Sequence, residues 1–155
     1  MNFKISPPLS CDVLVIGGGG ASLLAMDAVT RAGLKPANYS DLGPGKGIHE
    51  KLKVLIKAVL SNPAVKAIIT GGAIATADDI GRSAAAVASM IKDQGLDTSK
   101  IPIVARWAGY NDDGLKEAWE KIPGAIYYGA EKSFEEATER VIGLVKAQKA
   151  KGGNS

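Results

Sequence analysis

Two glycine-rich segments are the part of this chain best suited to chemistry. Each follows a short apolar run: Val13–Ile16 leads into Gly17–Gly20, and Val65–Thr70 leads into Gly71–Gly72. A strand that ends in glycine and turns into a helix leaves backbone N–H groups without partners, and the helix dipole adds partial positive charge there. The two segments therefore predict sites for an anion, such as a carboxylate or a phosphoryl group.

The same glycines also fit a tight strand-to-helix turn with no ligand, and their spacing leaves both interpretations open. They match the dinucleotide-binding pattern GxGxxG poorly, although Asp41 lies at about the right distance for a ribose contact. A GxxxxGK[ST] phosphate loop is missing, because the glycine loop before Lys46 is not followed by Ser or Thr.

Arg106 is predicted at the end of a strand, at the same edge of the sheet as the glycine segments. A guanidinium there can hold a carboxylate through two parallel hydrogen bonds. An ion pair with Asp112 or Asp113 is the structural alternative, and the sequence does not decide between them. Trp107 and Tyr110 would either line a cleft beside Arg106 or pack against the core.

The other reactive side chains have simpler explanations. His49, the only histidine, is predicted in the first turn of a helix with no partner for nucleophilic or metal chemistry, so we expect no metal on this chain. Cys11 has no second cysteine to pair with and is expected to be buried. Asp78 and Asp79 favour a helix start, where a carboxylate interacts well with the dipole. Their charge would oppose an anion at the second glycine segment.

Composition limits the class of protein. The 155 residues fit one domain, 1–155, with 46% hydrophobic and 5% aromatic residues and a net charge of +3. We see no basic stripe interleaved with aromatic residues, so we expect no nucleic acid partner. No apolar run approaches the roughly 20 residues that cross a membrane, and one cysteine favours a cytoplasmic location. Residues 1–10 are expected to form an extended arm and residues 147–155 a flexible tail.

The apolar pattern predicts five strands alternating with five helices. This order is typical of an α/β fold: a flavodoxin-like three-layer sandwich with a five-stranded parallel sheet, order 2-1-3-4-5, and helices on both faces. The long third helix is predicted to start at Thr76, with Thr76 and Asp79 as a capping box; Asn111–Asp113 cap the fourth, and Ser133 and Glu136 the fifth. The predicted strands are residues 13–16, 37–41, 67–70, 101–105 and 124–128.

Four short stretches together resemble one known family. They are Gly18–Ser22, Pro36–Gly43 without Ser40, Ile69–Ala75, and Arg106 followed by Gly109, Asn111 and Gly114. Their order over residues 12–145 resembles the C-terminal CoA-ligase domain of the succinyl-CoA synthetase β subunit. It is similar also to the matching region of ATP-citrate lyase and citryl-CoA synthetase.

The resemblance implies a flavodoxin-like fold whose glycine loops and arginine bind the carboxylates of an organic acid. It implies no catalytic residue on this chain. The chain departs from the citrate lyase branch at Thr76–Asp78, where that branch has Asn-Phe-Thr, so the polar contacts to the acid differ. The substrate-binding residues that it implies are Gly18, Gly19, Gly20, Ala21, Gly71, Gly72, Ala75, Thr76 and Arg106.

The resemblance also implies partners. In that family an acyl-CoA is made from an acid, CoA and a nucleoside triphosphate through a phosphohistidine and an acyl phosphate. We expect a di- or tricarboxylate as substrate, an ATP-grasp partner, and a CoA-binding subunit with the phosphohistidine. CoA and ATP or GTP with Mg would then sit on those partners, and this chain alone would be inactive. The alternatives are a non-catalytic module that binds a small anion, and a flavodoxin-type flavin or nucleotide binder.

Overall fold

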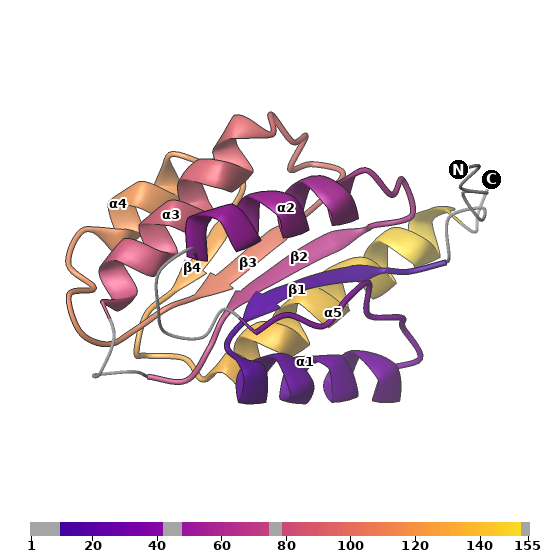
Figure 1. The fold of residues 1–155 in the computed structure, drawn as a ribbon. Coiled ribbons are helices and arrows are strands. Elements are labelled where there is room, and N and C mark those ends of the chain that lie inside the picture. Colours follow the sequence, from indigo (N-terminus) through magenta and orange to yellow (C-terminus); the bar gives the residue numbers. More distant parts are fainter. Residues whose placement is uncertain (1–9, 42–47, 75–78, 153–155) are drawn as a thin grey trace, which may run out of the picture.

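The computed structural model describes residues 10–41, 48–74 and 79–152. Its sheet contains four parallel strands in the order β1-β2-β3-β4 (Figure 1). The sheet is short and its carboxyl ends meet at one edge, which is where the glycine segments begin. The strands are β1 Val13–Gly17, β2 Ala67–Gly71, β3 Ile103–Arg106 and β4 Ile126–Tyr128.

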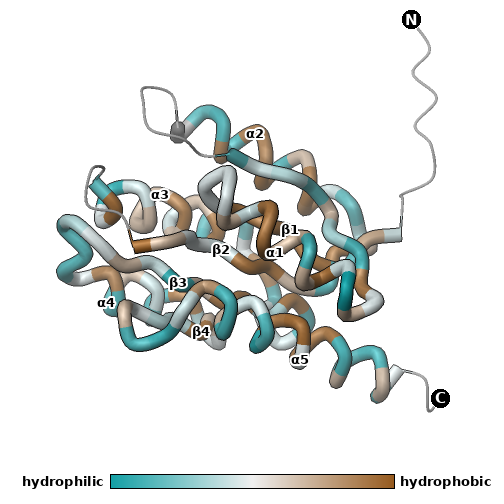
Figure 2. Tube along the Cα trace, turned by 90° about the horizontal axis from the view of Figure 1, so that it is seen from below, coloured by the Kyte–Doolittle hydropathy of each residue, from teal (hydrophilic) through white to brown (hydrophobic). Residues whose placement is uncertain are grey.

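Helices cover both faces of this sheet and make three layers. Helices α1 (Gly19–Arg31) and α5 (Phe134–Gly152) pack on one face. Helices α2 (Ile48–Leu60), α3 (Ile80–Asp93) and α4 (Leu115–Glu120) pack on the other (Figure 1). Figure 2 shows hydrophobic and hydrophilic residues alternating along α5, as expected of a helix with one buried side.

The apolar strands explain why both faces must be covered. All residues of β1, β2 and β3 are buried, and successive side chains point to opposite faces. Val13 and Val15 join the core under α1 and α5, whereas Leu14 and Ile16 join the core under α2, α3 and α4. The prediction of a buried parallel sheet is therefore confirmed.

The prediction of a fifth strand at residues 37–41 is wrong. This segment lies beside β1, but among the described residues the bridge to β1 joins Val13 to Pro36, just before the segment begins. Beyond that bridge, side chains replace the backbone ladder: Asn38 Nδ2 donates to Val15 O (2.8 Å), and Asn38 Oδ1 accepts from Val15 N (3.0 Å). Because Asn38 and Ser40 use short polar side chains to reach the edge, the segment lies beside β1 without being a strand.

Two helix starts differ from the prediction. Helix α3 begins at Ile80 with Asp79 as its N-cap, not at Thr76, which lies outside the described residues. Gly114, at φ 78°, is the N-cap of α4 in place of the predicted Asn111–Asp113. The capping box of α5 is confirmed by hydrogen bonds from Ser133 N to Glu136 Oε2 (2.7 Å) and from Glu136 N to Ser133 Oγ (3.0 Å).

Helix α5 continues to Gly152, through residues predicted to be a flexible tail. Two long-range contacts hold this end. Lys149 Nζ forms an ion pair with the buried Asp12 (2.7 Å), and Gln148 Nε2 donates to Lys100 O (2.9 Å). The predicted arm, and residues 153–155, fall almost wholly outside the described part of the chain. In that part, no helix combines the length and hydrophobicity needed to cross a membrane.

Candidate functional site

The ends of three strands meet in one row formed by Gly17, Gly71 and Arg106. A Cβ atom on Gly17 would overlap Gly71 O, and a Cβ atom on Gly71 would overlap Arg106 O. Gly71 also has φ 138°, which only glycine adopts readily. Close packing of the sheet therefore requires these two glycines whether or not a ligand binds.

The two glycine turns lie side by side, as expected from the order of the strands. A Cβ atom on Gly72 would be 3.7 Å from Ala21 Cβ, so the second turn touches the first turn of α1. By contrast, a Cβ atom on Gly18 or Gly20 would meet none of the described residues within 4 Å. In the described part of the chain, space is thus available at the first turn, beside the junction of the two loops.

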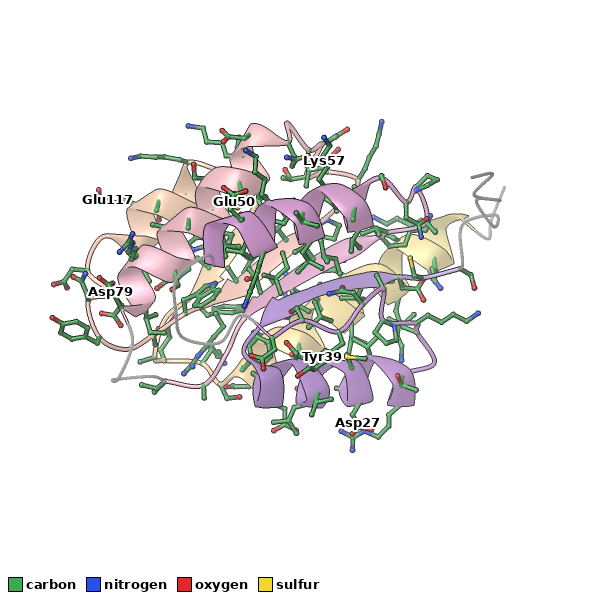
Figure 3. All side chains as sticks on the ribbon, in the orientation of Figure 1. Asp27, Tyr39, Glu50, Lys57, Asp79 and Glu117 are labelled. Atoms are coloured by element: carbon green, nitrogen blue, oxygen red, sulfur yellow. The ribbon has the colours of Figure 1, made fainter. Side chains whose placement is uncertain are left out.

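The first turn is partly capped by the chain itself. Ser40 Oγ accepts from Gly17 N (3.1 Å), and Asp41 Oδ1 accepts from Gly19 N (3.1 Å). Tyr39, labelled in Figure 3, also lies here, because its hydroxyl would be 3.1 Å from a Cβ atom on Gly19. One of the amides that the sequence predicts for anion binding, that of Gly19, therefore already donates to a carboxylate of the chain itself.

Other amides at this turn remain candidates for binding an anion. Gly18 is the N-cap of α1 and provides no side-chain cap, while Gly20 and Ala21 lie in the first helical turn. First-turn amides have no partner inside their own helix. Gly20 is exposed and Ala21 half-buried, so both are within reach of a ligand.

The start of α3, beyond the second turn, is capped in the same way. Asp79 Oδ1 accepts from Arg82 N (2.8 Å) and from Asn111 Nδ2 (3.1 Å), and Ile80 N donates to Tyr110 O (3.2 Å). The Arg82 amide is the main cause that lowers the pKa of Asp79. Figure 3 labels Asp79 at this helix start. Ala75, Thr76 and Asp78 lie outside the described residues.

Arg106 braces the second turn. Its side chain is buried, and it donates from Nη1 to Gly72 O (2.8 Å) and from Nε to Lys132 O (2.7 Å). Arg106 O in turn accepts from Gly72 N (3.3 Å). The structural alternative, an ion pair of Arg106 with Asp112 or Asp113, is wrong: in the described part of the chain Arg106 forms no ion pair. Asp112 instead accepts a hydrogen bond from Gly109 N (3.0 Å). Nη2 of Arg106 makes no hydrogen bond to the described residues.

The remaining candidates are ordinary structural residues. Cys11 is buried as predicted, and burial raises the pKa of its thiol; Asn62 Nδ2 donates to its Sγ (3.3 Å). His49 falls in the first turn of α2, and its side chain is outside the described part. Within the described ranges, no three of the His, Cys, Asp and Glu side chains are grouped so as to hold a metal.

A groove of about 380 Å³ lies elsewhere, between α2 and α3. Charged and polar side chains line much of it, including Glu50, Lys53 and Asp93, and Ile56 and Met90 also line it. None of the glycine-turn residues contributes to this groove. The edge of the sheet, where the two turns and Arg106 meet, is the better candidate.

Sequence reasoning missed two features of this edge. The first is Asp41, whose carboxylate caps Gly19; its position at the end of the segment beside β1 could have indicated this. The second is Thr70, a polar residue that ends the apolar run of β2 just before Gly71. It is completely buried, and its Oγ1 has no hydrogen-bond partner within residues 10–41, 48–74 and 79–152.

Most of this chain is similar to known proteins. The succinate–CoA ligase [ADP-forming] β subunit of Chloroflexus aggregans is 30% identical over 145 residues, which are 90% of this chain and 35% of that protein. The same subunit from Pyrobaculum arsenaticum is 33% identical over 134 residues, 84% of this chain and 34% of that protein. This chain thus spans about a third of the length of the curated relatives it matches.

A solved structure shares the fold. It is a mutant Methanosaeta concilii ATP citrate lyase in complex with (3S)-citryl-CoA, with a TM-score of 0.70 at 24% identity. The match covers 91% of this chain and 38% of that one. The family model described as CoA-ligase matches residues 15–140, from β1 into α5. The chain therefore belongs to the CoA-ligase family, whose members include parts of multi-part acyl-CoA synthetases.

Proposed function

We propose that this chain is the acid-binding part of an NDP-forming acyl-CoA synthetase of the succinyl-CoA synthetase, citryl-CoA synthetase or ATP citrate lyase type. The observation that carries the proposal is the meeting of two glycine turns and one arginine at a single sheet edge. Partner chains would supply the ATP-grasp fold, the phosphohistidine and the CoA site. ATP or GTP with Mg and CoA would bind there, not on this chain alone.

In this proposal the acid carboxylate binds over the first turn of α1. The amides of Gly20 and Ala21 would donate to it, the helix dipole would favour its charge, and Nη2 of Arg106 would approach it from the end of β3, on the far side of β2. The Arg106–Gly72 contact would hold the second turn against the first, so that both turns keep their spacing when the acid binds. The chain's role is then electrostatic positioning of the acid and of a developing acyl phosphate.

The second candidate function is a non-catalytic module with the same fold that binds a small anion or none. The specific support is that Asp41 and Asp79 place carboxylates on amides of both helix starts. Because like charges repel, these two carboxylates weaken the binding of any anion beside them.

Ligand binding separates the two candidates. A methyl group on Gly18 meets no atom of the described residues within 4 Å, so Gly18→Ala should fold but fill the open space at the first turn. If the acid binds there, the added methyl group displaces it from the amides. Losing one charge-assisted hydrogen bond then weakens the binding of the acid about tenfold or more. We would measure the affinity of succinate, malate and citrate by calorimetry, with exposed Gly143→Ala in α5 as the matched control.

Co-purification is the second test of the proposed function. A catalytic part should retain an ATP-grasp protein and a histidine-bearing CoA-binding subunit when it is isolated from its own cells. The acid-binding function is rejected if the wild-type chain, alone or with those partners, binds none of the three acids. Binding that Gly18→Ala leaves unchanged would move the acid away from the first turn.

A further inference from the structure

Two buried polar atoms near the strand ends have no hydrogen-bond partner among the residues that the structure describes. They are Thr70 Oγ1, on a residue that is 0% exposed, and Trp107 Nε1, on a residue that is 6% exposed. A buried donor or acceptor without a partner costs stability, and native proteins keep such groups rare. A third such atom, Trp119 Nε1, belongs to α4 and not to a strand end.

Thr70 and Trp107 lie on the same face of the sheet. Thr70 pairs in register with Ala105, and Trp107 is two residues further along the same run. Ile68, Ala105 and Trp107 all belong to the core under α2, α3 and α4, so alternation places Thr70 on that face as well. The backbone of Trp107 is fixed by its bonds to β4: Trp107 N donates to Tyr128 O (3.2 Å), and Tyr127 Oη donates to Trp107 O (2.9 Å).

Nothing on β1 or β2 separates Thr70 from the sheet edge on this face. The next residues on the same side are Gly18 after Ile16 and Gly72 after Thr70, and neither has a side chain. The open space at Gly18 adjoins this row. A ligand atom seated between the glycine turns would therefore meet no side chain of β1 or β2 on its way to the Thr70 hydroxyl.

The chemistry of the two atoms limits what they bind. Trp Nε1 is a donor only, while a Thr hydroxyl both donates and accepts. The neighbours of Thr70 in the sheet, Ile16 and Ala105, are apolar, and Arg106 alternates to the opposite face, under α1 and α5. A carboxylate would be buried here without a counter-charge, whereas a hydroxyl needs only one donor and one acceptor.

We propose that Thr70 and Trp107 are specificity-determining residues that receive the hydroxyl group of a hydroxylated di- or tricarboxylic acid. The inference rests on the proposed function, because the carboxylates of the same acid occupy the glycine turns and Arg106. The acid then spans the sheet edge, with charge on the α1 side and its hydroxyl on the α3 side. The hydroxyl oxygen accepts from Trp107 Nε1, and its hydrogen is donated to Thr70 Oγ1.

Two acids that differ only by a hydroxyl test this inference. We would measure the affinities of succinate and of each enantiomer of malate by calorimetry. One net hydrogen bond predicts that wild type prefers one malate enantiomer over succinate about 3- to 10-fold. Thr70→Val keeps the shape and removes the hydroxyl, and Trp107→Phe keeps an aromatic ring and removes the N–H. Each should bring the ratio close to one.

Thr138→Val is the matched control. Thr138 is also buried, but its hydroxyl donates to Phe134 O (2.8 Å) in α5. It should leave the malate-to-succinate ratio unchanged and lower the Tm of the ligand-free chain. Thr70→Val should raise that Tm, because it removes a hydroxyl that has no partner.

The outcomes are distinct. Equal affinity for both acids in wild type, or a ratio that Thr70→Val leaves unchanged, overturns the inference while the proposed function stands. If Thr70→Val lowers the Tm and leaves the malate-to-succinate affinity ratio unchanged, the Thr70 hydroxyl binds an internal water. That result also overturns the inference. If the chain binds neither acid, with or without its partners, the proposed function falls together with the inference.

Discussion

The contact between α3 and the loop after β3 allows a sharp test of the fold at this edge. Gly81, in the first turn of α3, is buried, and a Cβ atom there would overlap the backbone oxygen of Asn111. Asn111 has φ 62°, and its loop is held to α3 by the Asn111–Asp79 and Tyr110–Ile80 hydrogen bonds. We therefore predict that Gly81→Ala is destabilising, although alanine is the better helix former.

The magnitude follows from these contacts. Pushing the loop away costs about 1–3 kcal/mol for overpacking, and losing both hydrogen bonds adds about 2 kcal/mol. The helix propensity of alanine returns about 1 kcal/mol. The net loss is about 2–4 kcal/mol, which lowers the Tm of a chain of this size by about 5–15 °C.

Gly143→Ala is the matched control because it makes the same change in a helix without a neighbour. Gly143 is exposed in α5, and a Cβ atom there meets nothing within 4 Å. It should gain about 0.5–1 kcal/mol and raise the Tm by a few degrees. Calorimetric and denaturant-induced unfolding of both variants measures the difference. If Gly81→Ala is as stable as Gly143→Ala, the close packing of α3 against Asn111 is refuted.

Three further predictions concern stability. Asn38→Ala should cost about 1–2 kcal/mol and speed hydrogen exchange at the Val15 amide; unchanged exchange would mean that Asn38 does not protect β1. Lys149→Ala should cost about 1–2 kcal/mol in urea unfolding, because it leaves the buried carboxylate of Asp12 without its ion pair; no change would show that solvent screens the pair. Hydrogen bonding to the Ser133 amide and then to Lys132 lowers the pKa of Glu136, so its contribution is complete above pH 4.5 and is lost as pH falls through the lowered value. Glu136→Gln should make the fall of Tm between pH 5 and pH 3 shallower, and an identical slope would contradict this.

Apolar runs and glycines were sufficient to predict the four strands of the sheet and most helices. Val13–Ile16 and Ala67–Thr70 have to be buried on both faces, and Gly33, at φ 79°, lies just beyond the C-cap of α1. The segment after Pro36 was wrongly predicted as a strand, because a strand and a segment that bonds to a sheet edge through its side chains use similar residues. Only coordinates show that Asn38 and Ser40 bond to the edge of β1.

The candidate site was predictable in place but not in detail. The order of the strands brings both glycine turns and Arg106 to one edge, and the structure has them there. Sequence could not show that Asp41 caps Gly19 or that Arg106 donates to Gly72 and Lys132, since these contacts join distant segments. Whether the amides bind an acid stays a prediction.

The polar segment along β1 has a consequence for assembly. Unpaired strand edges invite pairing with strands of other chains. Here Asn38 and Ser40 already satisfy the outer edge of β1, and the opposite edge belongs to β4, which has only three residues. Sheet extension across a subunit boundary is therefore disfavoured at both sides of this domain, and other chains would have to dock on its helices and turns.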